Sequence, residues 1–190
     1  MVKIYKILLL LLPIIFIISG CNNKQPENTI VEYGDFKCSY CKDVEDDIMP
    51  KLKKQYIDTD KADYSFKNVA TLGLDSLIGA RAGNAVEMYA PDEYLKFQKA
   101  MFDKQPNNEK TWITTKLVNE EIDDLDVKEE IKEKIKKEYN RADSKTADKI
   151  TKDNEQAKKH KIKTVPTVFI NGKKVKDPHD YKEYEKLLKK

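Results

Sequence analysis

Residues 35–42 read DFKCSYCK and place Cys38 and Cys41 three positions apart in a chain with one other cysteine, Cys21. This spacing is typical of half a zinc site, a small structural disulfide or a working redox pair. Zinc requires about two further ligands, and the two histidines, His160 and His179, lie outside the usual spacing. A disulfide closing so short a loop would remove little chain entropy and stabilise the fold only slightly.

The sequence on either side of the pair favours the redox interpretation. Residues 29–33 (TIVEY) and 63–70 (DYSFKNVA) have strand composition, and residues 39–55 carry apolar side chains at helical spacing. This order predicts a βαβ unit with parallel strands and a helix kinked at Pro50. Both cysteines then lie at the helix N-terminus, where free N–H groups and the dipole lower a thiol pKa. We expect Cys38 to be exposed and Cys41, one turn further on, to be covered.

The middle of the chain shows only helical patterns. Asp75 is a candidate N-cap for the first helix and Pro91 suits the first turn of the second. Apolar stripes predict two more helices near residues 117–125 and 127–139, and a highly charged helix covers 144–159. Strand signals are missing from this stretch, which indicates a helical insertion.

The strand pattern returns at residues 164–170 (TVPTVFI). Proline is tolerated in a sheet mainly at an edge or at the start of a strand. Together with the cysteine pair, Pro166 predicts a cis-proline that places the Val165 backbone against the cysteines. Asn171-Gly172 predicts a hairpin turn into residues 173–175, and a last helix follows.

The expected fold class is therefore α/β, a thioredoxin fold with an inserted all-helical subdomain. Residues 29–72 and 161–190 are expected to form the two parts of the thioredoxin-like domain, and residues 73–160 the insertion. C-x-x-C beside a βαβ pattern is the recognised signal for this fold.

The N-terminal residues 1–20 read MVKIYKILLLLLPIIFIISG, with two lysines before an apolar run that is short for a membrane span. This pattern is typical of a secretory signal peptide; an uncleaved anchor is the alternative. Residues 18–21 (ISGC) resemble a bacterial lipobox, in which Cys21 becomes the lipid-modified N-terminus, and residues 21–28 would form a polar tether. The implied place is the outer face of the cell membrane, an oxidising compartment.

The charge pattern excludes an electrostatic nucleic-acid surface. The 36 basic and 33 acidic residues give a net charge of +3 and are interspersed throughout. Binding of nucleic acid would require basic residues clustered on one face. The charged residues are instead expected to form a solvated surface.

Several motifs together resemble the DsbA family of thiol:disulfide oxidoreductases, most closely its lipid-anchored Gram-positive, staphylococcal-type form. They are Glu32, the CSYC motif at 38–41, Val165-Pro166 and the FING motif at 169–172, with a helical block between them. Residues 33–35 (YGD), 49–52 (MPKL) and 177–181 (DPHDY) agree with this resemblance. It covers most of the chain from Thr29 onward.

The resemblance implies a role for individual residues. Cys38 would be the nucleophile, Cys41 the resolving cysteine and Pro166 the cis-proline. The Val165 backbone would bind an extended substrate segment, and Tyr40 would flank the site. Glu32 would be a buried acid relaying protons to the inner thiol, although an exposed strand carboxylate is an equal alternative. Relatives usually carry proline where this chain has Ser39, whose N–H and hydroxyl are candidate donors to a Cys38 thiolate and whose effect on the redox potential is open.

The resulting hypothesis is a monomeric, lipid-anchored enzyme that introduces disulfides into exported proteins without a metal or organic cofactor. Its partners would be unfolded or reduced exported proteins and a reoxidant, either in the membrane or a small molecule. Two alternatives stay open. One is a reductase or isomerase using the same pair, and the other is a lipid-anchored peptide-binding module.

Overall fold

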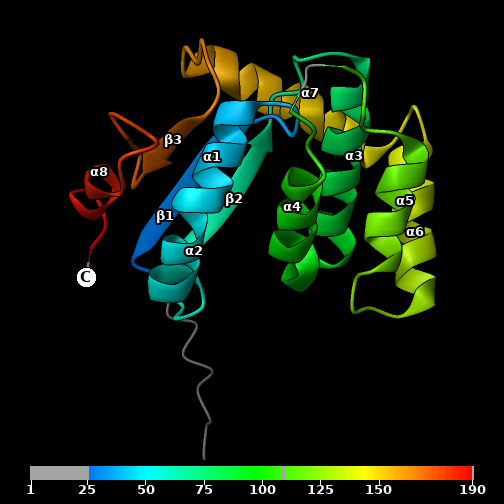
Figure 1. The fold of residues 1–190 in the computed structure, drawn as a ribbon, viewed down its shortest axis with the longest axis horizontal. Coiled ribbons are helices and arrows are strands. Elements are labelled where there is room, and N and C mark those ends of the chain that lie inside the picture. Colours follow the sequence, from blue (N-terminus) through cyan, green and yellow to red (C-terminus); the bar gives the residue numbers. More distant parts are fainter. Residues whose placement is uncertain (1–25, 108–109, 190) are drawn as a thin grey trace, which may run out of the picture.

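The computed structural model describes residues 26–107 and 110–189 (Figure 1). Four strands form one sheet in the order β2-β1-β3-β4. Strand β1 (Asn28–Gly34) pairs in parallel with β2 (Ala62–Asn68), and β3 (Thr167–Ile170) runs antiparallel to β1 and to β4 (Lys173–Lys174). The predicted parallel βαβ unit and the thioredoxin-like fold are confirmed. The signal peptide, the lipobox with Cys21 and most of the tether lie outside the described residues.

Helices cover both faces of the sheet. The helix α1 (Ser39–Asp47), the short helix α2 (Met49–Leu52) and α8 (Tyr181–Glu185) pack on one face through Val44, Leu52 and Tyr184. Side chains alternate along a strand, so Ile30 and Glu32 of β1 point toward this face. Val31 and Tyr33 point to the opposite face.

The helix after the cysteines is interrupted more strongly than predicted. Helix α1 ends at Asp47, α2 begins at Met49, and a π-helical turn, η1 (Lys53–Ile57), completes the segment. Pro50 lies in the first turn of α2. Proline has no N–H to continue the bonding of the preceding helix, so the predicted kink appears as two helices separated by Ile48, which keeps helical backbone angles.

Between β2 and β3 the chain forms the helical insertion, at one side of the sheet in Figure 1. Its elements are α3 (Leu74–Tyr89), the 3-10 turn η2 (Pro91–Glu93), α4 (Tyr94–Asp103), α5 (Thr115–Asp123), α6 (Glu129–Asn140) and α7 (Lys145–Lys159). Ala157 of α7 packs against Tyr33 and Val69, so this helix returns to the second face of the sheet. The exact boundaries between the subdomains stay predictions.

One expectation about the insertion is wrong. Asp75 does not cap α3, because Gly73 occupies the N-cap position and Asp75 lies in the first turn. The Asp75 carboxylate instead accepts the Lys37 ammonium at 2.8 Å and the Trp112 N–H at 3.0 Å. Asp75 therefore joins the loop before the cysteines to the segment that precedes α5.

Phe36 joins the sheet to the insertion. Its ring stacks on that of Phe66 on β2, with the ring centroids 5.5 Å apart. It also packs against the rings of Phe97 and Phe102 on α4, at centroid distances of 6.3 and 5.3 Å. All four rings are fully buried. Aromatic contacts of this geometry add to the stabilisation from area burial, so the loop that carries the cysteines is anchored in the core that both parts share.

Candidate active site

Cys38 and Cys41 lie at the N-terminal end of α1, where the sequence predicted them, and both are free thiols. Cys38 is the N-cap residue, and its Sγ accepts the Cys41 backbone N–H at 3.3 Å. Its thiol also donates to the Val165 carbonyl oxygen at 3.5 Å. The motif thus places one sulfur atom at the positive end of a helix, beside the backbone of the loop before β3.

The prediction that Cys38 is exposed is wrong. The residue is only 6% exposed, against 0% for Cys41. The N-cap position turns the Cys38 thiol inward against Val165, and that loop covers it. Cys38 remains the more accessible of the two cysteines.

The two thiols have opposite electrostatic environments. A hydrogen bond from the Cys41 thiol, together with the backbone N–H groups of Cys41 and Tyr40, lowers the pKa of Cys38 against the effect of burial. Burial raises the pKa of Cys41, and its contact with Cys38 and the nearby Glu32 raise it further. A single negative charge shared by the pair therefore resides on Cys38, where it makes the nucleophile of thiol–disulfide exchange.

The Val165–Pro166 peptide bond is cis, as predicted. It lies directly before β3, so that Val165 faces Cys38 across the site. With both cysteines as free thiols, the Val165 carbonyl oxygen accepts a hydrogen bond from the Cys38 thiol.

Glu32 is buried, at 4% exposure, and burial raises its pKa to about 8. Its Oε2 accepts a hydrogen bond from the hydroxyl of Tyr64 on β2 at 3.0 Å, and this hydrogen bond lowers the pKa of Glu32. The expectation of a buried acid beside the inner thiol is thereby confirmed in its geometry. A group that titrates near neutral pH can take up and release a proton during the reaction.

Ser39 and Tyr40 occupy the two positions between the cysteines. Both are exposed, and the Tyr40 ring, at 63% exposure, lies beside His179 at 6.0 Å. The Nε2 atom of His179 is 3.1 Å from the Tyr40 carbonyl oxygen. The donors to Cys38 are the N–H groups of Tyr40 and Cys41, and not Ser39 as the sequence suggested.

The sequence interpretation missed the role of Asp35. Its buried carboxylate accepts the Lys37, Thr71 and Leu72 N–H groups and the Ser76 hydroxyl, at 2.9, 2.9, 3.1 and 2.5 Å. It thus fixes the loop after β2 against the start of the cysteine loop. Its place after the strand suggested only a turn, since three of the four donors lie 36 to 41 residues away.

The comparisons with known proteins agree with this geometry. The family model described as Thioredoxin matches residues 22–190. The chain belongs to the thioredoxin family. The chain is 34% identical over 164 residues to disulfide bond formation protein D of Bacillus subtilis, covering 85% of this chain and 71% of that protein. The probable disulfide bond formation protein D of Bacillus cereus is also 34% identical, over 85% of this chain and 74% of its own length.

Solved structures show the same fold. The crystal structure of oxidised BdbD from Bacillus subtilis superposes with a TM-score of 0.75 at 33% identity, covering 86% of each chain. The thiol-disulfide exchange protein alpha-DsbA2 of Wolbachia pipientis shares the fold, with a TM-score of 0.68 at 20% identity over 86% of this chain and 81% of that one. The protein is a DsbA-like thiol:disulfide oxidoreductase.

Proposed function

We propose that the chain oxidises dithiols of exported proteins to disulfides through Cys38 and Cys41. The observation that carries the proposal is the N-cap position of Cys38, whose thiolate is favoured over that of the buried Cys41. A stabilised thiolate favours the reduced form of the pair, and so makes its disulfide a stronger oxidant. The curated relatives named for disulfide bond formation support this direction.

The proposed reaction has two exchange steps. A substrate thiolate attacks Cys38 Sγ of the oxidised pair, forms a mixed disulfide and releases Cys41 as a thiolate, which takes up a proton. The second substrate thiol loses its proton and attacks the substrate sulfur of the mixed disulfide, which releases Cys38 as the stabilised thiolate. Two electrons pass from the substrate to the pair, and a separate reoxidant, in the membrane or a small molecule, must remove them.

The redox potential tests the direction. The pair is equilibrated in glutathione buffers at pH 7, and the oxidised fraction is measured by thiol alkylation and mass spectrometry. We expect a potential above about −180 mV, the value of protein disulfide isomerase. A value near the −270 mV or so of thioredoxin would overturn the oxidase proposal and support the reductase.

A refolding assay tests the alternative of a peptide-binding module. The oxidised protein should accelerate disulfide formation in a reduced client, and the Cys38→Ala variant should not. Acceleration of client oxidation that survives Cys38→Ala would overturn the proposal that the pair is the oxidant.

We also propose that Cys21 carries lipid and holds the protein at the outer face of the membrane. The support is the junction at residues 18–21, directly after the apolar run. Among the described residues, no helix is long and apolar enough to cross a membrane. Two or more acyl chains bind a membrane stably, whereas one binds marginally. Cys21→Ala should release the protein to the medium or leave the precursor unprocessed, and unchanged fractionation would refute the lipid anchor.

A further inference from the structure

Four side chains form a hydrogen-bonded chain that runs from Glu32 on β1 through the helical insertion to Glu45 on α1. Tyr64 Oη donates to Glu32 Oε2 at 3.0 Å, and Gln98 Nε2 donates to Tyr64 Oη at 3.0 Å. The same nitrogen donates to Glu45 Oε2 at 2.7 Å. Glu32, Gln98 and Glu45 are buried, at 4%, 1% and 7% exposure. One amide of α4 thus connects a carboxyl of β1 with a carboxyl of α1.

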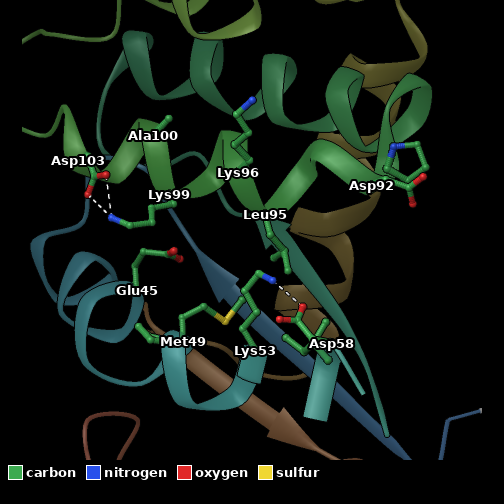
Figure 2. A pocket seen from close by; sticks show the side chains of 13 residues that line it. Glu45, Met49, Lys53, Asp58, Asp92, Leu95, Lys96, Lys99, Ala100 and Asp103 are labelled. Carbon is green, nitrogen blue, oxygen red and sulfur yellow. Dashed lines mark hydrogen bonds and ion pairs between the residues drawn. The ribbon is translucent and has the colours of Figure 1, made fainter. Parts of the chain in front are cut away.

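Glu45 is the more exposed of the two carboxyls in this chain. It lines a groove of about 840 Å³ between the α1–α2 segment and α4, and Figure 2 shows its side chain on the wall of this groove. Lys99, across the groove, is bound to both carboxylate oxygens of Asp103 at 2.7 Å. Lys99, whose charge lowers the pKa of Glu45, is therefore shared with another acid, whereas Gln98 donates a hydrogen bond directly to Glu45.

The charged and titratable groups around Glu32 and Glu45 determine whether ionisation of one carboxyl favours or opposes ionisation of the other. Charged groups facing or lining the groove beside Glu45 are Asp46, Lys53, Asp58, Asp92, Lys96, Lys99 and Asp103. Titratable groups that interact with Glu32 are Cys38, Cys41, Glu45, Tyr64, Tyr94 and Tyr184. Negative charge on Glu45 opposes ionisation of Glu32, whereas the Tyr64 hydroxyl favours it.

We propose that Glu45, held by Gln98, is a tuning residue for thiol–disulfide exchange, and that its charge sets the pH range in which Glu32 accepts the Cys41 proton. The amide of Gln98 donates both of its hydrogens and does not itself carry a proton between the acids. It fixes their relative position. The helical insertion thereby acts on the chemistry of the cysteine pair, as well as on its packing.

The proposal rests on the exchange reaction proposed above, and it concerns one proton. When Cys41 attacks a mixed disulfide on Cys38, its thiol proton passes to the Glu32 carboxylate. The Cys41–Cys38 bond then forms, and the partner thiolate leaves. This step requires an ionised Glu32, so its rate rises with pH through the Glu32 midpoint.

The test measures that midpoint in single turnovers. Reduced protein is mixed with oxidised glutathione between pH 5 and 10 and quenched with acid, and mass spectrometry separates the dithiol, the mixed disulfide and the final disulfide. Glu45→Gln keeps an oxygen that can accept from Gln98 but removes the charge, and should lower the midpoint by about one unit. Tyr64→Phe removes the donor to Glu32 and should raise it by about one unit.

Asp46→Asn is the matched control. It removes an equal charge one residue away, from a side chain that is 42% exposed and bound to Lys42. Water and salt screen such a charge, so the midpoint should hardly move and the small shift should vanish in 1 M salt. The shift in Glu45→Gln should persist there. Equal shifts in the two variants, or shifts of one sign in Glu45→Gln and Tyr64→Phe, would overturn the proposal.

The unmodified protein provides an independent measurement. Infrared titration with labelled glutamate, assigned by comparison with Glu32→Gln and Glu45→Gln, should show that the Glu32 and Glu45 carboxyls titrate in dependence on each other. Independent titrations of these two carboxyls would overturn the coupling. Failure of the wild-type protein to form or resolve the mixed disulfide would instead refute the proposed function. A wild-type reaction with an unchanged Glu45→Gln midpoint would refute this inference alone.

Discussion

Cys38 and Cys41 are separated by less than one helical turn, yet their sulfur atoms meet opposite conditions. The Cys38 sulfur takes the N-cap position of α1 and accepts backbone N–H groups, whereas Cys41 is fully buried close to Glu32. Helix geometry contributes to this difference, since an N-cap side chain faces the free N–H groups of the first turn, and burial of Cys41 adds to it. The same motif therefore supplies one charged and one neutral sulfur.

The difference predicts unequal reactivity. Iodoacetamide should label Cys38 of the reduced protein first near pH 6, because its pKa is lowered and that of Cys41 is raised. Cys41→Ala should accumulate mixed disulfides when it meets a disulfide-bearing partner, whereas Cys38→Ala should accumulate few. Peptide mapping measures both, and equal labelling rates would contradict the assignment.

Glu32 predicts a pH-dependent stability. Its pKa rises from about 4.5 when unfolded to about 8 in the fold, so the folded state holds a proton that the unfolded state has lost. This contribution to stability is complete below pH 4.5 and is lost as the pH rises through 8. Glu32→Gln should remove the dependence, and at pH 9 should raise the free energy of unfolding by about 2 kcal/mol or more relative to wild type.

Urea unfolding of the reduced protein at pH 5 and pH 9 measures this difference. Glu120→Gln, at an exposed side chain of α5, is the control and should follow the wild type. A Glu32→Gln variant that loses as much stability with rising pH as the wild type would show that another group is responsible.

At the scale of the elements, two glycines are required for different reasons. Gly34 ends β1 beneath the redox pair, where an added Cβ would come within 2.5 Å of Phe66 Cε2 and 3.5 Å of Cys41 Sγ. Gly172 lies in the hairpin turn at φ +76°, with open space around it. Gly34 is required because the Phe66 ring leaves no room for a Cβ, and Gly172 is required because its backbone has a positive φ.

Alanine at each position should separate these causes. Gly34→Ala overpacks the core and should lower the free energy of unfolding by about 1–3 kcal/mol. Gly172→Ala strains only the turn and should cost about 1 kcal/mol. Phe66→Leu should partly rescue Gly34→Ala and leave the effect of Gly172→Ala unchanged, as measured by urea unfolding; equal rescue of both would refute the steric account.

What the sequence could predict depended on the range of the interactions. The strand composition of residues 29–33 and the Asn171-Gly172 turn are local signals, and the strands appear where they predict. The contact of Tyr64 with Glu32 could have been predicted, because Tyr64 lies two residues before Phe66, the residue paired with Glu32 in the parallel register. The contact of Gln98 with Glu45 could not have been predicted, because Gln98 lies on a helix 53 positions further along the chain. A helical pattern does not show which of its polar residues is buried.

At the scale of the whole molecule, the insertion and the sheet share one core through Phe36, and the redox state of the pair is linked to that core. Reduction leaves a thiolate at the start of α1, which the fold stabilises above the lowered pKa of Cys38. That gain fades as the pH falls through this pKa. Each unit by which the pKa is lowered corresponds to roughly 1.4 kcal/mol, or roughly 30 mV for a two-electron couple.

We therefore expect the reduced protein to resist urea better than the oxidised protein near pH 7.5, with a difference that narrows toward acid pH. This is the opposite of an ordinary structural disulfide, which stabilises the fold when it forms. Parallel unfolding curves of the two forms test the expectation. Greater stability of the oxidised form at pH 7.5 would contradict it.

The start of β1 also determines which way the enzyme would face. Asn28 is fixed at one end of the sheet, where its side chain bonds the backbone of Lys61 and Lys189 and the amide of Asn171. The cysteine loop begins beyond the opposite end of the same strand, about 20 Å away at roughly 3.3 Å per residue. A lipid on Cys21 would thus tether the protein by its base, with the sulfur atoms directed outward. Newly exported chains would reach the sulfur atoms from the side that faces away from the membrane. A reoxidant embedded in the bilayer would reach them only if the domain reoriented on the short tether that precedes β1.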